Sequence, residues 1–163
     1  VKSEKTTFGI GFDIHRLIRN KKLYLGGTRI QFHSGLQGHS DGDVILHAII
    51  DAILGATQKK DIGTYYPSNK NRFKNIRSPK MLKPIIDNLY RNNFLINNLD
   101  INLICQKPKV SMYRNKIINS VSSLMNLDKK KINLKGKTVE KLGLIGKEKA
   151  IACEVIISIT KYD

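Results

Sequence analysis

The segment from residue 43 to residue 56 is apolar except for three side chains that repeat every four residues: Asp43, His47 and Asp51. A spacing of four places them along one stripe of a helix. Because the helix is apolar on nearly all other sides, we expect it to be buried. Two carboxylates and an imidazole are costly to bury unless they pair or bind a cation. The segment therefore predicts either a metal site or a closed hydrogen-bond network.

A second set of suitable side chains, Asp13 and His15, stands at the end of an alternating apolar run. The alternation predicts a strand from Thr7 to Ile14, and side chains two residues apart lie on the same side of a strand. This geometry suits two ligands of one metal ion, although a hydrogen-bonded surface pair has the same spacing. Together with His47, the pair gives one carboxylate and two imidazoles, which is the ligand set of a zinc site with an open fourth position.

Further polar residues are expected to support this site. Asp43 and Asp51 lie one turn on either side of His47, and we expect one of them to accept the second ring N–H of that histidine. His39 stands just ahead of the helix N-terminus, where backbone N–H groups favour an anion, so it is placed to hold a phosphate.

The elements that position these residues alternate irregularly along the chain. Beyond the strand and helix above, the sequence predicts strands at 23–25, 28–32, 100–106, 132–137 and 150–160, and helices beginning at 78 and 111. Several strands before the first long helix indicate an α+β fold. We expect one domain, 1–163, built as a two-layer sandwich with helices on one face of a mixed or antiparallel sheet. The other, apolar face is expected to be buried against copies of the chain.

The composition gives 29 Lys and Arg against 13 Asp and Glu, a net charge of +16. This charge allows a basic nucleic-acid-binding module as an alternative. However, the lysines are spread among many Asn and Ile residues, and few aromatic residues accompany them, which disfavours single-strand binding. We therefore expect no nucleic-acid partner. No apolar run approaches the roughly 20 residues of a membrane span, so no membrane partner is expected either. The two cysteines, Cys105 and Cys153, are expected to be small buried side chains.

The chain resembles the 2-C-methyl-D-erythritol 2,4-cyclodiphosphate synthase family over nearly its whole length. The motifs that carry the resemblance are, in order, Gly11-Phe12-Asp13-Ile14-His15, His39-Ser40-Asp41-Gly42-Asp43 with His47 and Asp51, Asp61-Ile62-Gly63, Gln106-Lys107-Pro108-Lys109, Thr138-Val139-Glu140-Lys141-Leu142-Gly143 and Ile151-Ala152-Cys153-Glu154. So many motifs in this order are highly specific.

The resemblance implies an enzyme of non-mevalonate isoprenoid biosynthesis. Its reaction would cyclise 4-diphosphocytidyl-2-C-methyl-D-erythritol 2-phosphate to the 2,4-cyclodiphosphate and release CMP. It also implies a homotrimer with each active site between subunits. An isoprenoid diphosphate is expected in a central cavity near Leu144 and Lys147.

The resemblance also assigns roles to single residues. Zinc, one ion per subunit, would bind Asp13, His15 and His47; a second ion, Mg²⁺ or Mn²⁺, would be held mostly by the substrate's phosphates and contact Glu140. His39, Lys137 and Thr138 are expected to act on the reacting phosphates, His39 as a hydrogen-bonding group. The full set of expected substrate contacts is Asp13, His15, His39, Ser40, Asp61, Gly63, Cys105, Lys109, Gly136, Lys137, Thr138 and Glu140.

Two positions depart from the family pattern. Ser68 stands where the family has a carboxylate after Tyr66-Pro67, and Lys137 stands where it has a threonine. A metal-dependent phosphoesterase is a further alternative, because Asp13-x-His15 followed by Gly42-Asp43 imitates the start of that motif set; its Gly-Asn-His element is missing. For location, the pathway implies bacterial cytoplasm or a plastid-type organelle. The Lys, Asn and Ile bias and the start at Val1 favour an apicoplast protein after leader removal.

Overall fold

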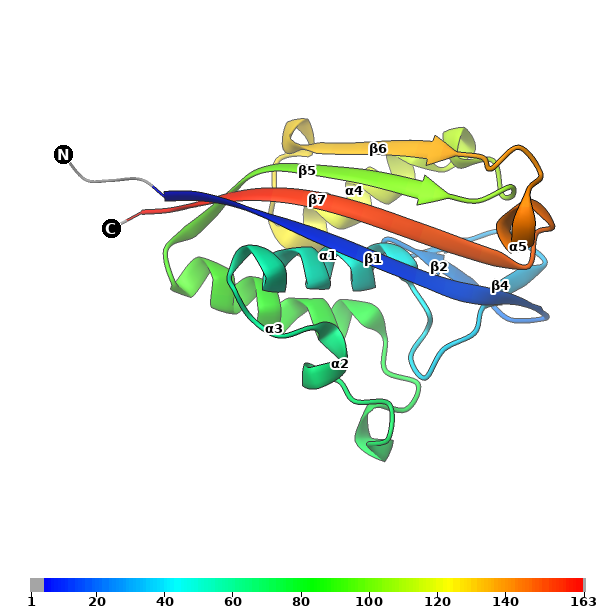
Figure 1. Cartoon of the computed structure of the whole chain (residues 1–163), viewed down its shortest axis with the longest axis horizontal. Coiled ribbons are helices and arrows are strands. Elements are labelled where there is room, and N and C mark those ends of the chain that lie inside the picture. The colour runs from blue at the N-terminus through cyan, green and yellow to red at the C-terminus, as the bar shows by residue number, and fades with distance from the viewer. Residues whose placement is uncertain (1–4, 163) are drawn as a thin grey trace.

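A five-stranded sheet forms one layer of the molecule (Figure 1). The computed structural model describes residues 5–162. The strand order is β4-β1-β7-β5-β6, in which β5 and β6 are parallel and the other pairs are antiparallel. A separate hairpin joins β2 and β3. The strands are β1 (Lys5–Arg19), β2 (Leu23–Leu25), β3 (Thr28–Ile30), β4 (Ser34–Leu36), β5 (Phe94–Ile104), β6 (Ile132–Lys137) and β7 (Ala150–Lys161).

Helices form the second layer, on one face of the sheet (Figure 1). Helix α1 packs on β1 and β7, α3 packs on α1 and β5, and α4 packs on α3 and β6. The helices are α1 (Val44–Ala56), α2 (Ile62–Tyr65), α3 (Ser78–Arg91), α4 (Arg114–Met125) and α5 (Gly143–Gly146), with short 3₁₀ turns at Asn71–Phe73, Val110–Met112 and Lys129–Lys131. The predicted α+β fold with helices on one face is confirmed.

Two glycines of β1 let α1 lie directly on the sheet. A Cβ at Gly9 would meet the carbonyl oxygen of Ala52 at 1.9 Å, and one at Gly11 would meet that of Ala48 at 1.8 Å. No other residue allows so close an approach between a strand and a helix backbone. The helix is buried along almost its whole length, as its apolar sequence predicts. This contact brings the side chains of β1 and α1 together.

The opposite face of β1 is apolar and exposed. Phe8, Ile10, Phe12 and Ile14 are 71%, 62%, 55% and 45% exposed, and Ile156 on β7 is 50% exposed. Large exposed apolar patches of this kind mark interaction surfaces. The open apolar face expected from the sequence is therefore present.

Several element boundaries differ from the sequence-based predictions. Strand β1 continues beyond its predicted end at Ile14 to Arg19, because it pairs there with β4. That short strand was not predicted. Strand β5 begins at Phe94 rather than at residue 100. The helix predicted to begin at residue 111 begins at Arg114, which leaves Met112 in a 3₁₀ turn and 73% exposed.

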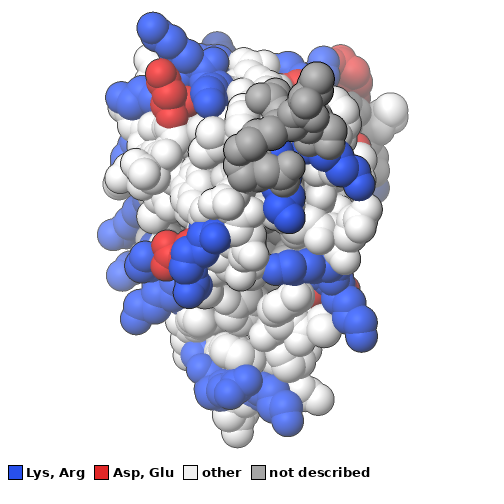
Figure 2. Space-filling model, turned by 90° about the vertical axis from the view of Figure 1, so that its left-hand side faces the viewer, with Lys and Arg blue, Asp and Glu red and all other residues white. Residues whose placement is uncertain are grey.

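Charged side chains do not gather into a single basic surface on the face seen in Figure 2, where Lys and Arg form several separate groups. Both cysteines are free and buried, as expected. Within residues 5–162, every helix is too short or too polar to cross a bilayer.

Candidate metal centre and substrate pocket

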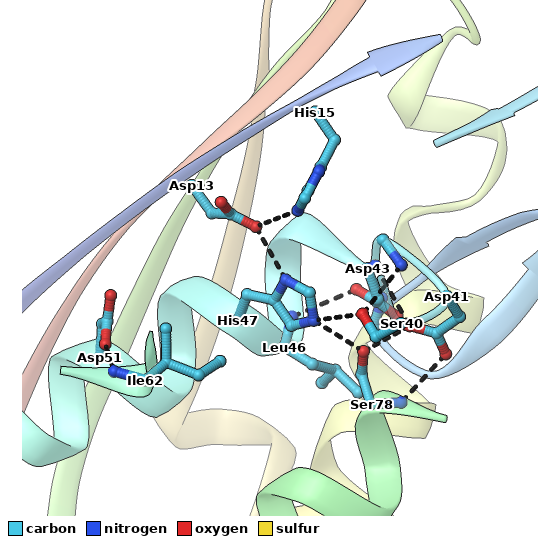
Figure 3. Close-up of polar contacts among 12 residues, drawn as sticks. Asp13, His15, Ser40, Asp41, Asp43, Leu46, His47, Asp51, Ile62 and Ser78 are labelled. Carbon is cyan, nitrogen blue, oxygen red and sulfur yellow. Dashed lines mark hydrogen bonds and ion pairs between the residues drawn. The ribbon is translucent and has the colours of Figure 1, made fainter. Parts of the chain in front are cut away.

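Asp13 and His15 on β1 converge with His47 on α1 (Figure 3). One carboxylate oxygen of Asp13, Oδ2, lies 2.9 Å from His47 Nδ1 and 3.1 Å from His15 Nε2. One ligand atom from each residue falls within 4.8 Å of the others. One carboxylate and two imidazoles form a donor set that fits a divalent metal such as zinc. The structure thus brings the three predicted ligands into one potential metal site.

The electrostatics of the cluster favour a charged carboxylate. Burial alone would raise the pKa of Asp13, but hydrogen bonds from His15 and His47 lower it to about 2. Burial alone would lower the pKa of His47, but its hydrogen bond to Asp13 raises it. Asp13 is therefore an anion at neutral pH, the state in which a carboxylate binds a cation.

The other ring nitrogen of His47 faces two hydroxyl groups. Nε2 lies 3.1 Å from Ser40 Oγ and 3.0 Å from Ser78 Oγ. The Ser78 hydroxyl also makes a short hydrogen bond to Asp41 Oδ1. Since Ser78 and Asp41 are both buried, this side of the imidazole is enclosed by polar partners.

The prediction that Asp43 or Asp51 accepts the second N–H of His47 is wrong. Asp43 is the N-cap of α1: its carboxylate accepts hydrogen bonds from the backbone N–H groups of Gly26, Gly27 and Leu46. Asp51 Oδ1 accepts from the N–H of Ile62 at 2.7 Å, so it holds the start of α2 (Figure 3). Helical spacing placed these carboxylates near His47, but unpaired backbone donors nearby take their oxygens.

A pocket of about 250 Å³ opens beside the metal cluster. Its lining is Asp13, His15, His39, Ser40, His47, Ile62, Gly63, Tyr66, Ser68, Phe73, Ile76 and Met81. Five residues expected from the family resemblance to contact substrate (Asp13, His15, His39, Ser40 and Gly63) therefore border one cavity. Asp61 is exposed outside this lining, where its Oδ1 accepts from the N–H and the hydroxyl of Thr64.

The remaining predicted site residues form a second group at the ends of β5 and β6. Cys105 N–H donates to the carbonyl of Lys137, and the Thr138 hydroxyl donates to Glu140. A Cβ at Gly136 would meet the side chain of Val110 at 2.5 Å, so the loop after β5 packs closely on β6. No member of this second group lines the pocket among the described residues.

The strand register relates the two groups. Ile14 pairs with Ala152, Ala152 pairs with Ile104, and Ile104 pairs with Lys137. The metal cluster and the second group thus lie at the same level of the sheet. They are separated across the width of the sheet, since β7 and β5 lie between β1 and β6.

The sequence matches the YgbB family over residues 6–160. The chain belongs to the YgbB family. It is 56% identical over 156 residues to the "Bifunctional enzyme IspD/IspF" of Pelagibacter ubique, covering 96% of this chain but only 42% of that relative. It is 42% identical over 153 residues to the 2-C-methyl-D-erythritol 2,4-cyclodiphosphate synthase of Clostridium botulinum, covering 94% of this chain and 98% of the relative.

A solved structure of a family member agrees with the fold. The CDP complex of IspF from Plasmodium falciparum superposes with a TM-score of 0.85 at 41% identity, covering 97% of each chain. The family resemblance and the fold inferred from the sequence are both confirmed.

Sequence reasoning missed several residues that this member of the YgbB family places at the site. Ser78 was expected only to start a helix, yet its hydroxyl contacts His47. Asp41 holds Ser78 and pairs with Arg77, whose Nε lies 2.9 Å from Asp41 Oδ2. The available signal was a serine and an arginine before Pro79, but nothing in their spacing points to a histidine 31 residues earlier.

Proposed function

We propose that this chain cyclises 4-diphosphocytidyl-2-C-methyl-D-erythritol 2-phosphate to 2-C-methyl-D-erythritol 2,4-cyclodiphosphate and releases CMP. The observation that carries the proposal is the convergence of Asp13, His15 and His47 beside a pocket in a member of the YgbB family. Relatives that this chain spans almost completely carry the name of that synthase.

The reaction requires no nucleophile from the protein. An oxygen of the substrate's 2-phosphate attacks the β-phosphorus, and the bond from that phosphorus to the CMP oxygen breaks. The protein must therefore align the attacking and leaving oxygens and stabilise the charge that they carry. In this proposal Asp13, His15 and His47 hold zinc, which when bound supplies positive charge beside the phosphates.

The pocket residues would bind the methylerythritol and phosphate half of the substrate. His39 and Ser40 border the cavity and carry groups that hydrogen-bond to phosphate. Gly63 leaves room at the rim, where the nearest atom to an added Cβ would be 3.6 Å away. Asp61, two residues earlier, would accept hydrogen bonds from the methylerythritol hydroxyls. Its carboxylate is charged at neutral pH, and hydrogen bonds from Thr64 lower its pKa further below its ordinary value.

The second group would bind the cytidine diphosphate half and complete a site on a neighbouring subunit. Lys137, Thr138, Lys109 and Glu140 are exposed, and Gly136 and the backbone at Cys105 lie beside them. Glu140 would contact Mg²⁺ or Mn²⁺ held by the phosphates. The two groups occupy the same level of the sheet but are separated across its width. Adjacent subunits of a ring can therefore bring the metal cluster of one chain beside the second group of its neighbour.

The exposed apolar face of β1 and β7 supports a closed homotrimer as the assembly. A ring of three sheets facing one another would bury Phe8, Ile10, Phe12 and Ile156, which are exposed to solvent in the single chain. A central cavity with an isoprenoid diphosphate near Leu144 and Lys147 stays a prediction. The curated relatives named above are bacterial, which supports bacterial cytoplasm; the plastid-type location stays a prediction of the composition.

The test is an assay of the purified protein, loaded with zinc and supplied with Mg²⁺, on the cytidyl substrate. We expect stoichiometric CMP and the cyclic diphosphate, with no inorganic phosphate. Inorganic phosphate as the product would instead identify a phosphoesterase. Failure of the zinc-loaded protein to release CMP would refute the proposed reaction.

A further inference from the structure

We propose that Asp41 and Ser78 are positioning residues for the metal site, acting through the proton on His47 Nε2. In this arrangement Asp41 accepts the Ser78 hydroxyl proton, and Ser78 therefore accepts the Nε2–H of His47. The Nδ1 lone pair of His47 is then directed at the metal position beside Asp13. The inference rests on the proposed function in one respect, that His47 binds a metal ion.

The direction of these hydrogen bonds follows from the groups that surround Asp41. Oδ1 faces the Ser78 hydroxyl and the backbone N–H of Asp43; Oδ2 faces the backbone N–H of Ser78 and the Nε–H of Arg77. An ionised carboxylate has only acceptors. Because Ser78 has a single hydroxyl hydrogen and donates it to Asp41, its oxygen can only accept from His47.

The chain Asp41–Ser78–His47 is buried. Ser78 is 0% exposed, Asp41 7% and His47 8%. Asp41 is held in turn by Arg77, whose guanidinium stacks on the Tyr24 ring with 3.8 Å between its central carbon and the ring centroid. Partners of this kind fix the tautomer and orientation of a metal-binding histidine. Ser40 Oγ also lies 3.1 Å from Nε2, but no hydrogen bond joins it to the Asp41 carboxylate among the described residues.

Asp41→Asn tests the direction of the proton chain, because it changes hydrogen-bonding type with little change of shape. The amide oxygen is expected at the Oδ2 position, which faces two fixed donors, the Arg77 Nε–H and the Ser78 N–H. Oδ1 faces one fixed donor, the Asp43 N–H, beside the rotatable Ser78 hydroxyl. The amide NH₂ then faces Ser78 and turns its hydroxyl toward Nε2 of His47. This favours the wrong tautomer, with the proton on Nδ1 where the metal should bind.

The experiment measures zinc affinity by competition with a chelator in four proteins: wild type, Asp41→Asn, Ser78→Ala and the double variant. We expect Asp41→Asn to bind zinc about 10- to 100-fold more weakly than wild type. Ser78→Ala should lose less than about 10-fold, because the Ser40 hydroxyl still accepts from Nε2. The double variant should bind zinc more tightly than Asp41→Asn alone, since it lacks the misdirected donor. Urea unfolding of the metal-free proteins gives the stability of each variant separately.

A second measurement addresses wild type directly. Protein with ¹⁵N-labelled histidine is loaded with ¹¹³Cd²⁺, and the coupling between the metal and the His47 nitrogens is recorded. We expect coupling to Nδ1 and a proton on Nε2. Coupling to Nε2, absence of metal binding by wild type, or a double variant weaker than Asp41→Asn would each overturn the inference. If the four proteins show the expected order of zinc affinities but the wild type releases no CMP, the proposed reaction fails and this inference stands.

Discussion

His47 connects the two sides of the site, because each of its ring nitrogens meets different partners. Nδ1 faces the Asp13 carboxylate, and Nε2 faces the hydroxyls of Ser40 and Ser78. Its ring lies edge-on to that of His15, with 5.5 Å between the centroids. A change at this residue should therefore act first on metal binding.

For His47→Ala we expect loss of zinc and of CMP release from a protein that still folds. Zinc affinity should fall by more than the roughly 100-fold that loss of a supporting partner costs, because a direct ligand is missing. Stability should fall by about 1–3 kcal/mol, since buried partners lose a hydrogen bond. The measurements are metal content per subunit and urea unfolding. His33→Ala is the matched control, because His33 is exposed and its ring bonds to Ser34. Stoichiometric zinc in His47→Ala would show that the ligand assignment is wrong.

Asp41 should make the stability of the metal-free protein sensitive to acid. Burial alone would raise its pKa, but hydrogen bonds from Ser78 and Arg77 outweigh burial and lower the pKa below its ordinary value of 3.8. An acid with a lowered pKa stabilises the fold above that ordinary value, and the contribution is lost as the pH falls through the folded-state pKa. Between about pH 5 and about pH 2, the unfolding free energy should therefore fall more in wild type than in Asp41→Asn.

The measurement is urea unfolding at a series of pH values with a chelator present. Asp87→Asn is the control for removing one carboxylate, because the Asp87–Lys83 pair is largely exposed and contributes little. Equal acid sensitivity of wild type and Asp41→Asn would contradict the prediction.

Residue types and spacing were sufficient to predict that Asp13, His15 and His47 meet. The first two share a side of a strand, and the third is one of three polar groups on a buried helix. The same reasoning was wrong for Asp43 and Asp51, because spacing shows which stripe a side chain occupies but not which donor it finds. Contacts of Asp43 with Gly26 and Gly27 depend on the hairpin turn, which no local pattern places beside the helix.

At the scale of elements, the position of the proposed metal ligands depends on how closely β1 and α1 approach. A Cβ at Gly11 would lie 1.8 Å from the Ala48 carbonyl oxygen and 2.8 Å from the Ala52 nitrogen. These atoms belong to the helix backbone and cannot rotate away. Any larger residue must push α1 off the sheet and separate His47 from the ligands on β1.

Gly11→Ala should accordingly destabilise the protein by about 1–3 kcal/mol or more and weaken zinc binding. Gly55→Ala is the matched control in the same interface. Its Cβ would have no neighbour nearer than 3.8 Å, and the position is exposed in a helix, where alanine is favoured over glycine by up to about 1 kcal/mol. Urea unfolding and chelator competition measure both effects. Equal stability losses in the two variants would show that close packing at Gly11 is not what holds α1.

The type of an element could be predicted where its apolar residues follow a clear strand or helix periodicity. The alternation in β1 and the continuous apolar stripe of α1 identify both elements. Strand β4 was missed, because its three residues Ser34–Leu36 carry no alternating pattern and pair only with the end of β1. The first part of β5 was missed because residues 94–99 include Asn97 and Asn98, where the pairing with β7 shifts register. Tertiary pairing rather than local preference decides such segments.

At the scale of the whole molecule, the hydrophobic pattern indicated an assembly, whereas a trimeric symmetry was implied only by the family resemblance. The apolar side chains of β1 from Phe8 to Ile14 alternate with the residues that face α1, so the strand presents an exposed apolar face on the side away from that helix. The need for a partner could thus be predicted from one strand. The proposed partition of the site between subunits was implied by the family resemblance alone. The residue pattern does not reveal it, because it depends on the register that sets Ile14 level with Lys137 across four strands.

A mixture of two inactive variants tests that partition. His47→Ala disables the metal half of a site, and Glu140→Gln disables the proposed second-ion contact in the other half. If each site takes one half from each of two neighbouring subunits, random trimers from an equal mixture contain both intact halves in about a quarter of their sites. Each pure variant should be inactive, whereas the mixed protein should show about a quarter of the wild-type rate of CMP release.

Subunits must exchange for this test, so the variants are refolded together with two different affinity tags. Capture through both tags in sequence then yields only mixed assemblies, and sedimentation gives their size. Because one of the three sites in each mixed trimer is intact, the captured protein should show about a third of the wild-type rate. The same variants refolded separately and then combined are the control. A site complete within one chain would leave the mixed assemblies inactive, since every chain would carry one broken half. Recovery of activity only after joint refolding would show that the metal cluster on β1 and α1 acts with the β6 end of a neighbour.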